Sequence, residues 1–310
     1  MKWKRTKSRD VIDVRGAPKG GRSGGLGGGG MQLPGGMAGL GGGAGILVLI
    51  VIVALQLFGG GDGESGGFDI GDIFGPALQA PGATEESPIP REQDPQVELK
   101  DFSTYVFEDT QDTWRGTFAE DGQDYEKAQL VLYDGAVQTE GCGGATSAVG
   151  PFYCPADGRV YLDLTFYEDM ARQLNAPGDF AWAYVIAHEM GHHVQNITGI
   201  NDEVSRLQGE DPDSANELSV RTELQADCYA GVWASTVYAV GDLEGGDLDE
   251  AFTASEAIGD DRLQEQAGGR VDPDSFTHGT SEQRRRWFET GYESGDPAAC
   301  DTFSVSDGEL

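Results

Sequence analysis

Alternating apolar and polar positions predict strands in the middle of the chain, and longer periodic segments predict helices after them. Residues 129–137 and 159–166 have the strand pattern, since apolar side chains recur at every second position of the latter. Helical patterns follow over residues 179–199, 211–241 and 248–266, and from the Thr280-Ser281 pair onward. Strands followed by helices predict an α+β fold rather than a doubly wound sheet.

Residues 37–58 carry no charge and end in the apolar run AGILVLIVIVALQLF. A segment of about 20 such residues is long enough to span a bilayer. A buried core helix would show an amphipathic period, which this run lacks. A cleaved signal peptide would need a small-x-small site after Leu57, and none follows. We therefore predict a single-pass signal anchor in the lipid bilayer.

The basic residues lie before this segment and set its predicted orientation. Residues 1–36 contain eight Lys or Arg and two Asp among many glycines, which predicts a disordered cytoplasmic tail. Residues 59–96 are rich in Gly, Pro and acid and predict a disordered linker. Residues 97–310 are then predicted to form one domain on the outer side of the cell membrane.

The whole chain has 21 basic and 53 acidic residues and a net charge of −32. This excess of negative charge excludes a nucleic-acid-binding protein, because phosphates need basic partners. Two interpretations of the acidity stay open: adaptation to a salty medium, and a bias in base composition.

The sequence HEMGH at residues 188–192 is the strongest chemical signal in the chain. His188 and His192 lie one turn apart on the same face of the predicted helix, so both imidazoles can bind one Zn²⁺. Glu189 stands beside them, within reach of a water molecule in the site. This H-E-x-x-H pattern is typical of zinc metallopeptidases. His193 points about 100° away from His192 and is predicted to pack rather than to bind metal.

Two histidines leave a catalytic zinc ion one protein ligand short. The next predicted helix offers Glu223 and Asp227, which share a face and lie among small apolar residues. We predict that Glu223 is the third ligand. Asp227 is predicted to accept a hydrogen bond from a ligating histidine and to fix its tautomer.

Several motifs occur in one order: GCGGATSAVGPFYCPADGRVYLDLTFYEDM, HEMGHHVQNITG, ELQADCYAG and SFTHGTSEQRRRWFETG. Together they resemble the neutral zinc metallopeptidase family of membrane-anchored bacterial proteins, over roughly residues 97–302. The resemblance implies a zincin-type domain that hydrolyses peptide bonds of peptides or proteins. The glycine-rich N-terminal tail looks peculiar to this chain.

Peptide hydrolysis at this site needs a general base and a group that stabilises the oxyanion. Glu189 is predicted to take a proton from the attacking water and to pass it to the leaving amine. His278 is the candidate for stabilising the oxyanion, and a structural histidine is the alternative. By analogy with zincins, the strand at residues 159–166 would pair with the extended substrate.

Four cysteines allow three pairings. We predict disulfides Cys142–Cys154 and Cys228–Cys300, in keeping with an oxidising compartment. The sequence as a whole predicts a membrane-anchored zinc metallopeptidase. The alternative is a zinc-stabilised binding or scaffold protein of the same fold without catalytic activity.

Overall fold

The computed structural model describes residues 1–17 and 86–310, and its sheet has four strands in the order β1-β2-β6-β5. The strands are β1 (Val11–Asp13), β2 (Gln129–Tyr133), β5 (Phe152–Cys154) and β6 (Arg159–Asp163). β1, β2 and β6 are parallel, and β5 runs antiparallel to β6 at the edge of the sheet. A separate hairpin joins β3 (Ala136–Gln138) to β4 (Gly144–Thr146).

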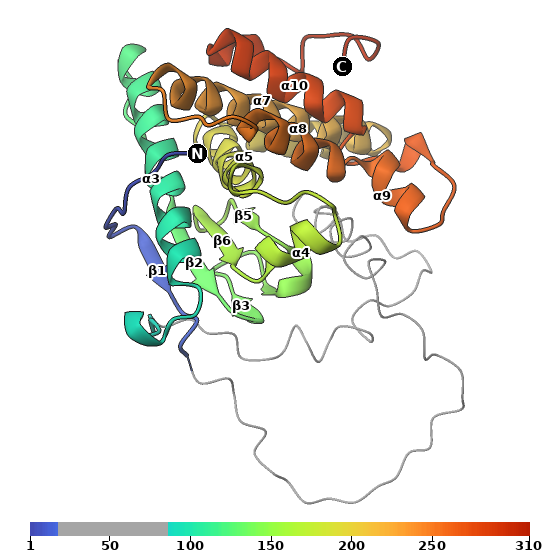
Figure 1. Ribbon diagram of the computed structural model, residues 1–310. Helices are drawn as coiled ribbons and strands as arrows, with labels where there is room; N and C mark the ends of the chain where they lie inside the picture. Colours follow the sequence, from blue (N-terminus) through green and yellow to red (C-terminus); the bar gives the residue numbers. More distant parts are fainter. Residues whose placement is uncertain (18–85) are drawn as a thin grey trace, which may run out of the picture.

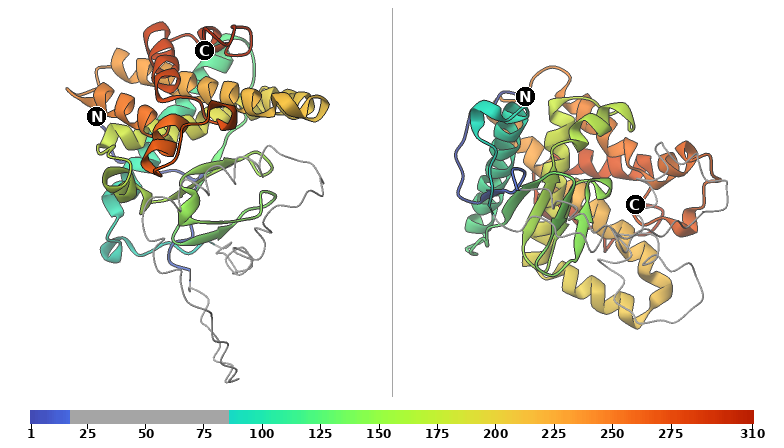
Figure 2. Two further views of the ribbon diagram at one scale, coloured as in Figure 1. Left: turned by 90° about the vertical axis from the view of Figure 1, so that its right-hand side faces the viewer. Right: turned by 90° about the horizontal axis from the view of Figure 1, so that it is seen from below.

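A helical layer covers one face of this sheet (Figures 1 and 2). The helices in the described residues are α3 (Val97–Glu120), α4 (Phe166–Arg172), α5 (Asp179–Ile197), α6 (Ile200–Glu210), α7 (Ala215–Ala239), α8 (Asp247–Ala257), α9 (Asp260–Gln266) and α10 (Ser281–Ser294). α5 lies between the sheet and helices α7 and α8, and α10 packs along α7. The α+β fold class is therefore confirmed.

Most of the predicted elements are present. The helices predicted over residues 179–199 and 211–241 correspond to α5 and α7, and the region 248–266 forms two helices, α8 and α9, instead of one. α10 begins with the predicted capping box, in which Thr280 and Gln283 bond reciprocally. Both predicted disulfides are confirmed, with S–S distances of 2.03 Å for Cys142–Cys154 and 2.02 Å for Cys228–Cys300.

The predicted disordered tail is wrong for residues 1–17, which pack against the domain. β1 adds a strand to the sheet beside β2, and Val14 is buried. The Arg15 guanidinium, itself buried, bonds to Asp13 at 2.9 Å and to Asp94 at 2.6 Å. Asp94 lies within the predicted linker, whose last residues, 86–96, also pack on the domain. The domain thus comprises residues 1–17 as well as the region from residue 86 onward.

The two ends of the segment 18–85 meet at one point. The Gly16 amide donates to the Ser87 carbonyl at 2.8 Å, and the Ser87 amide donates to the Asp13 carbonyl at 2.8 Å. A Cβ atom on Gly16 would lie 2.5 Å from the Ser87 carbonyl oxygen, so this close approach requires glycine.

The predicted anchor at residues 37–58 lies outside the described residues. None of the helices in residues 1–17 and 86–310 is long and apolar enough to cross a membrane. Because β1 and β2 pair in one sheet, residues 1–17 belong to the same folded unit as residues 86–310. The predicted anchor and its orientation stay predictions.

Candidate metal centre and active site

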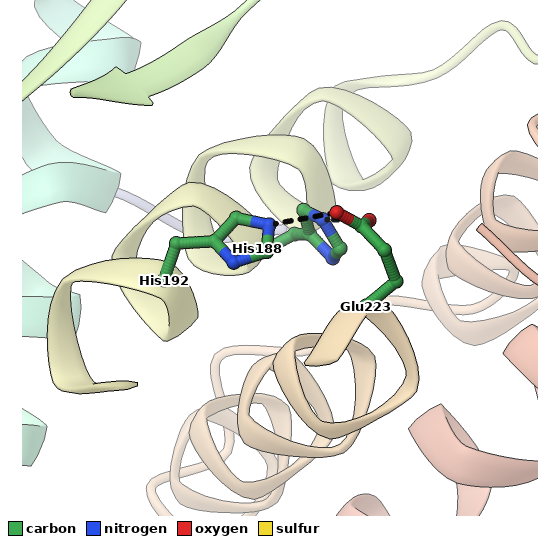
Figure 3. Close-up of side chains that lie close together, drawn as sticks. All are labelled: His188, His192 and Glu223. Carbon is green, nitrogen blue, oxygen red and sulfur yellow. Dashed lines mark ion pairs between the residues drawn. The ribbon is translucent and has the colours of Figure 1, made fainter. Parts of the chain in front are cut away.

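The predicted ligands converge in the core of the helical layer (Figure 3). His188 and His192 project from α5, and Glu223 faces them from α7. One ligand atom from each of the three side chains lies within 4.8 Å of the others. Gly191 lets α7 come close, since a Cβ at this position would lie 3.0 Å from the Ala226 Cα. The three side chains are largely buried, so the site is formed by packing rather than by a surface loop.

The geometry of these donors fits zinc. The Glu223 carboxylate oxygens lie 3.2 Å from His188 Nε2 and 3.4 Å from His192 Nε2. Two ligand atoms about 2.0–2.1 Å from a tetrahedral zinc ion lie roughly 3.3–3.4 Å apart. Two imidazoles and one carboxylate are also a donor set that zinc prefers in catalytic sites. The residues present could therefore hold Zn²⁺ and leave one position open.

Asp227 lies behind the ligands and holds His188. Its Oδ1 atom is 2.8 Å from His188 Nδ1, which leaves Nε2 directed toward Glu223. The same carboxylate accepts two bonds from the Arg284 guanidinium, at 2.8 and 2.9 Å, and one from the Tyr184 hydroxyl at 2.5 Å. Burial raises the pKa of Asp227, but Arg284 and His188 outweigh it and lower the pKa below its ordinary value.

His192 is held by a different residue. Gln195, one turn further along α5, accepts a bond from His192 Nδ1 to its Oε1 at 2.8 Å. Its amide nitrogen donates to the Thr222 carbonyl at 2.7 Å and thereby ties α5 to α7. Both ligating rings are thus oriented through Nδ1, one by a carboxylate and the other by an amide, and this favours coordination through Nε2.

Glu189 faces the same cavity as the ligands and is almost fully buried. Burial raises the pKa of its carboxyl group, although His188 and His192 act in the opposite direction. The cavity has a volume of about 140 Å³ and is also lined by His278 and by residues of β5. A reacting group in this space would lie beside Glu189, the metal ligands and His278 together.

His278 is positioned by Asp260 at the start of α9. One Asp260 oxygen lies 3.2 Å from His278 Nδ1, and the other accepts from the backbone amides of Thr277 and His278, both at 2.7 Å. Burial lowers the pKa of His278, but Asp260 and Glu223 outweigh it and raise the pKa. Among the described residues, none bonds to His278 Nε2, so this nitrogen is the one available to a molecule in the cavity.

His193 is not part of the ligand group. Its Nδ1 lies 3.1 Å from the Tyr153 hydroxyl and its Nε2 lies 2.7 Å from the Glu126 carbonyl oxygen. Asn196 also donates to the Tyr153 hydroxyl, at 2.9 Å. These bonds connect β5 to α5, the helix that carries His188 and His192.

The strand predicted at residues 159–166 is β6, which pairs with β2 along its whole length. On its other side, β5 pairs with residues 159–161 of β6. β5 lies at an edge of the sheet, and Phe152 and Tyr153 line the cavity. Substrate pairing with residues 159–166 stays a prediction, and β5 lies closer to the outer edge that an extended peptide could join.

Sequence reasoning missed four residues that orient the site: Tyr184, Gln195, Asp260 and Arg284. Tyr184 and Gln195 lie one turn from His188 and His192 on α5, so helical spacing could have indicated them. Asp260 and Arg284 come from α9 and α10, far from the ligands in sequence. No local pattern indicates their position.

Comparisons with known proteins agree with this site. Residues 1–303 match the family described as "Putative neutral zinc metallopeptidase". The uncharacterized protein YpfJ of Escherichia coli strain K12 is 46% identical over 309 residues, which cover 99% of this chain and 100% of YpfJ. The uncharacterized protein Mb2605 of Mycobacterium bovis is 46% identical over 194 residues, 59% of this chain and 64% of that protein. No solved structure matches the chain.

The family match begins at residue 1, so the N-terminal region is not peculiar to this chain. This extent of the family match agrees with the structure, in which β1 is a strand of the domain sheet. By this match and by the identity to YpfJ over nearly its whole length, the chain belongs to the putative neutral zinc metallopeptidase family.

Proposed function

We propose that this protein is a zincin-type peptidase that hydrolyses peptide bonds in peptides or proteins. One observation carries the proposal: His188, His192 and Glu223 bring three ligand atoms within 4.8 Å of one another, and Glu189 lines the same cavity. A site that only stabilised the fold would have four protein ligands and no cavity beside them. Here three protein ligands adjoin an open space that ends at an edge strand.

Each residue has a role that follows from its position. When bound, Zn²⁺ supplies Lewis acidity to the water and to the scissile carbonyl. Glu189 accepts the proton of the attacking water and returns it to the leaving amine. His278, held by Asp260 through Nδ1, donates from Nε2 to the developing oxyanion. β5 binds the extended substrate by backbone hydrogen bonds.

The disulfides support an oxidising compartment for the whole domain. Cys142–Cys154 and Cys228–Cys300 account for all four cysteines, and such bonds are rare in reducing cytoplasm. Residues 1–17 share that compartment because β1 belongs to the same sheet. We therefore propose that peptide hydrolysis takes place outside the cytoplasm.

Removal of the metal is expected to abolish peptide hydrolysis and to lower the melting temperature. A ligand present at about 1,000 times its Kd stabilises the native state by about 4 kcal/mol, and that contribution disappears with the metal. Activity and melting are measured before dialysis against a chelator, after it, and after addition of Zn²⁺. The Glu223→Ala variant is the control, because its melting should respond little to chelator. Unchanged activity in protein shown to be free of metal would contradict the proposal.

Substitution of Asp227 by asparagine is expected to weaken zinc affinity by about 10- to 100-fold. Asparagine keeps the shape of the side chain but removes the charge that orients His188 and pairs with Arg284. Affinity is measured by competition with a zinc-chelating dye. The exposed Asp213→Asn variant is the matched control. Equal affinity in both variants would show that Asp227 serves only the fold.

A further inference from the structure

The cavity beside the metal ligands continues into an apolar region that the proposed mechanism does not use. Its walls come from α4, from the segment that follows it, and from α8 and α9. The side chains that line it there are Phe166, Met170, Leu174, Ala176, Ala254 and Leu263, all largely buried, and the partly buried Ile258. None of these described lining residues carries a charge or a side-chain hydrogen-bonding group.

We infer that this region binds one large apolar side chain of the substrate, on a residue next to the bond that is cleaved. The inference rests on the proposed peptidase function. Glu189 and the ligands line the same cavity, so a peptide placed for attack extends a neighbouring side chain into it. An apolar wall binds an apolar side chain by removing both surfaces from water.

The volume limits the occupant to about one ring or one branched aliphatic group. The cavity measures about 140 Å³, including the space beside the ligands. A protein cavity of about 150 Å³ lined by aliphatic and aromatic residues holds one benzene molecule. One leucine, methionine or phenylalanine side chain is therefore of suitable size for this region. Aspartate and lysine are disfavoured because a charge buried in this region would lack a partner.

Ala254 and Ile258 set the size of the pocket from one side. They lie four residues apart at the end of α8, and both line the cavity. Ala254 is 2% exposed, so a larger side chain there can extend only into the pocket or into the core. Ala254→Leu is expected to fill the pocket, and Ile258→Ala is expected to enlarge it.

The test uses the full chain with Glu189→Gln, so that bound peptides stay intact. The probes are fluorescently labelled octapeptides of Gly, Ser and Ala, each with one variable central residue, and binding is followed by anisotropy. Peptides with Leu, Met or Phe are expected to bind roughly 10- to 100-fold more tightly than those with Ala. Ala254→Leu should remove this preference, and Ile258→Ala should shift it toward Trp.

Leu243→Ala is the matched control, since Leu243 is another partly buried aliphatic residue that packs against the same core cluster. It should leave the preference unchanged. Equal binding of all peptides, or a preference that survives in folded Ala254→Leu protein, would overturn the inference. If Ala254→Leu does not fold, an unchanged size preference in Ile258→Ala overturns it instead.

Cleavage of the same peptides by the wild-type chain separates this inference from the proposed function. Cleavage next to Leu, Met or Phe, mapped by mass spectrometry, supports both. Selective binding without any cleavage overturns the peptidase function and leaves the pocket in place. Cleavage without regard to the variable residue overturns the pocket alone.

Discussion

Replacement of Glu189 by glutamine is expected to lower kcat for peptide hydrolysis by roughly 10²- to 10⁴-fold, the usual contribution of a general base. Glutamine has nearly the same shape but cannot accept the proton of the attacking water. Because Glu189 is not among the three converging ligands, the variant should keep its zinc. Hydrolysis rates and metal content are measured on the same preparations.

The Glu265→Gln variant is the matched control, since Glu265 is exposed on α9. It should be as active as the wild type. Full activity in Glu189→Gln would show that Glu189 is not the base and would contradict the proposed mechanism. A wild-type protein that holds zinc but cleaves no peptide from a broad library would favour the non-catalytic scaffold.

Replacement of Arg15 by methionine is expected to lower the free energy of unfolding by about 3–5 kcal/mol, the cost of breaking a buried ion pair from one side. Arg15 is 5% exposed and bonds to Asp13 and Asp94, which are 3% and 6% exposed. Lys100 still reaches Asp13 at 2.6 Å, so Asp94 is the carboxylate left without its cation. Urea unfolding of both proteins measures the difference.

The Arg9→Met variant serves as the control, because Arg9 is exposed in the same N-terminal segment. Its effect should stay within about 0.5 kcal/mol. An equally small effect of Arg15→Met would mean that residues 1–17 contribute little to the stability of the domain.

The elements that depend on local pattern could be predicted from the sequence. α5 and α10 have clear periodicity or a capping box, and both were expected. The helix α3 was not expected from the sequence, because polar residues interrupt its buried face. Ser103, Thr104 and Thr110 lie there and bond to backbone carbonyls one turn earlier in the same helix. Such bonds satisfy the buried hydroxyl groups. Because these residues are polar, the buried face of α3 does not appear as an apolar stripe in the sequence.

The packing of the N-terminal segment could not be predicted, because its partners are distant in sequence. β1 has only three residues, too few for a recognisable pattern. Its flanking charges suggested a solvated tail. In the structure, acidic and basic residues across the domain pair with them, as in Arg15–Asp94 and Lys127–Asp10. Charge composition thus indicated disorder where tertiary ion pairs support a strand.

The residues of the candidate site also fall into two groups, those that helical spacing predicts and those that only tertiary packing brings to the site. His188, Glu189 and His192 follow from the spacing on one helix, and Glu223 and Asp227 from the spacing on another. That the two helices face each other across the metal centre depends on their packing. Arg284, on α10, and Asp260, on α9, reach the site only through that packing, so their roles became visible only in the structure.

The junction at Gly16 and Ser87 allows the segment between these two residues to vary in length within the family. Because the chain leaves the domain and returns to it at hydrogen-bonded neighbours, the segment between them is topologically an insertion. Each doubling in length of such an insertion costs only about 0.6 kcal/mol in closure entropy. Relatives can therefore lengthen, shorten or replace it while the sheet register and the metal centre stay as they are.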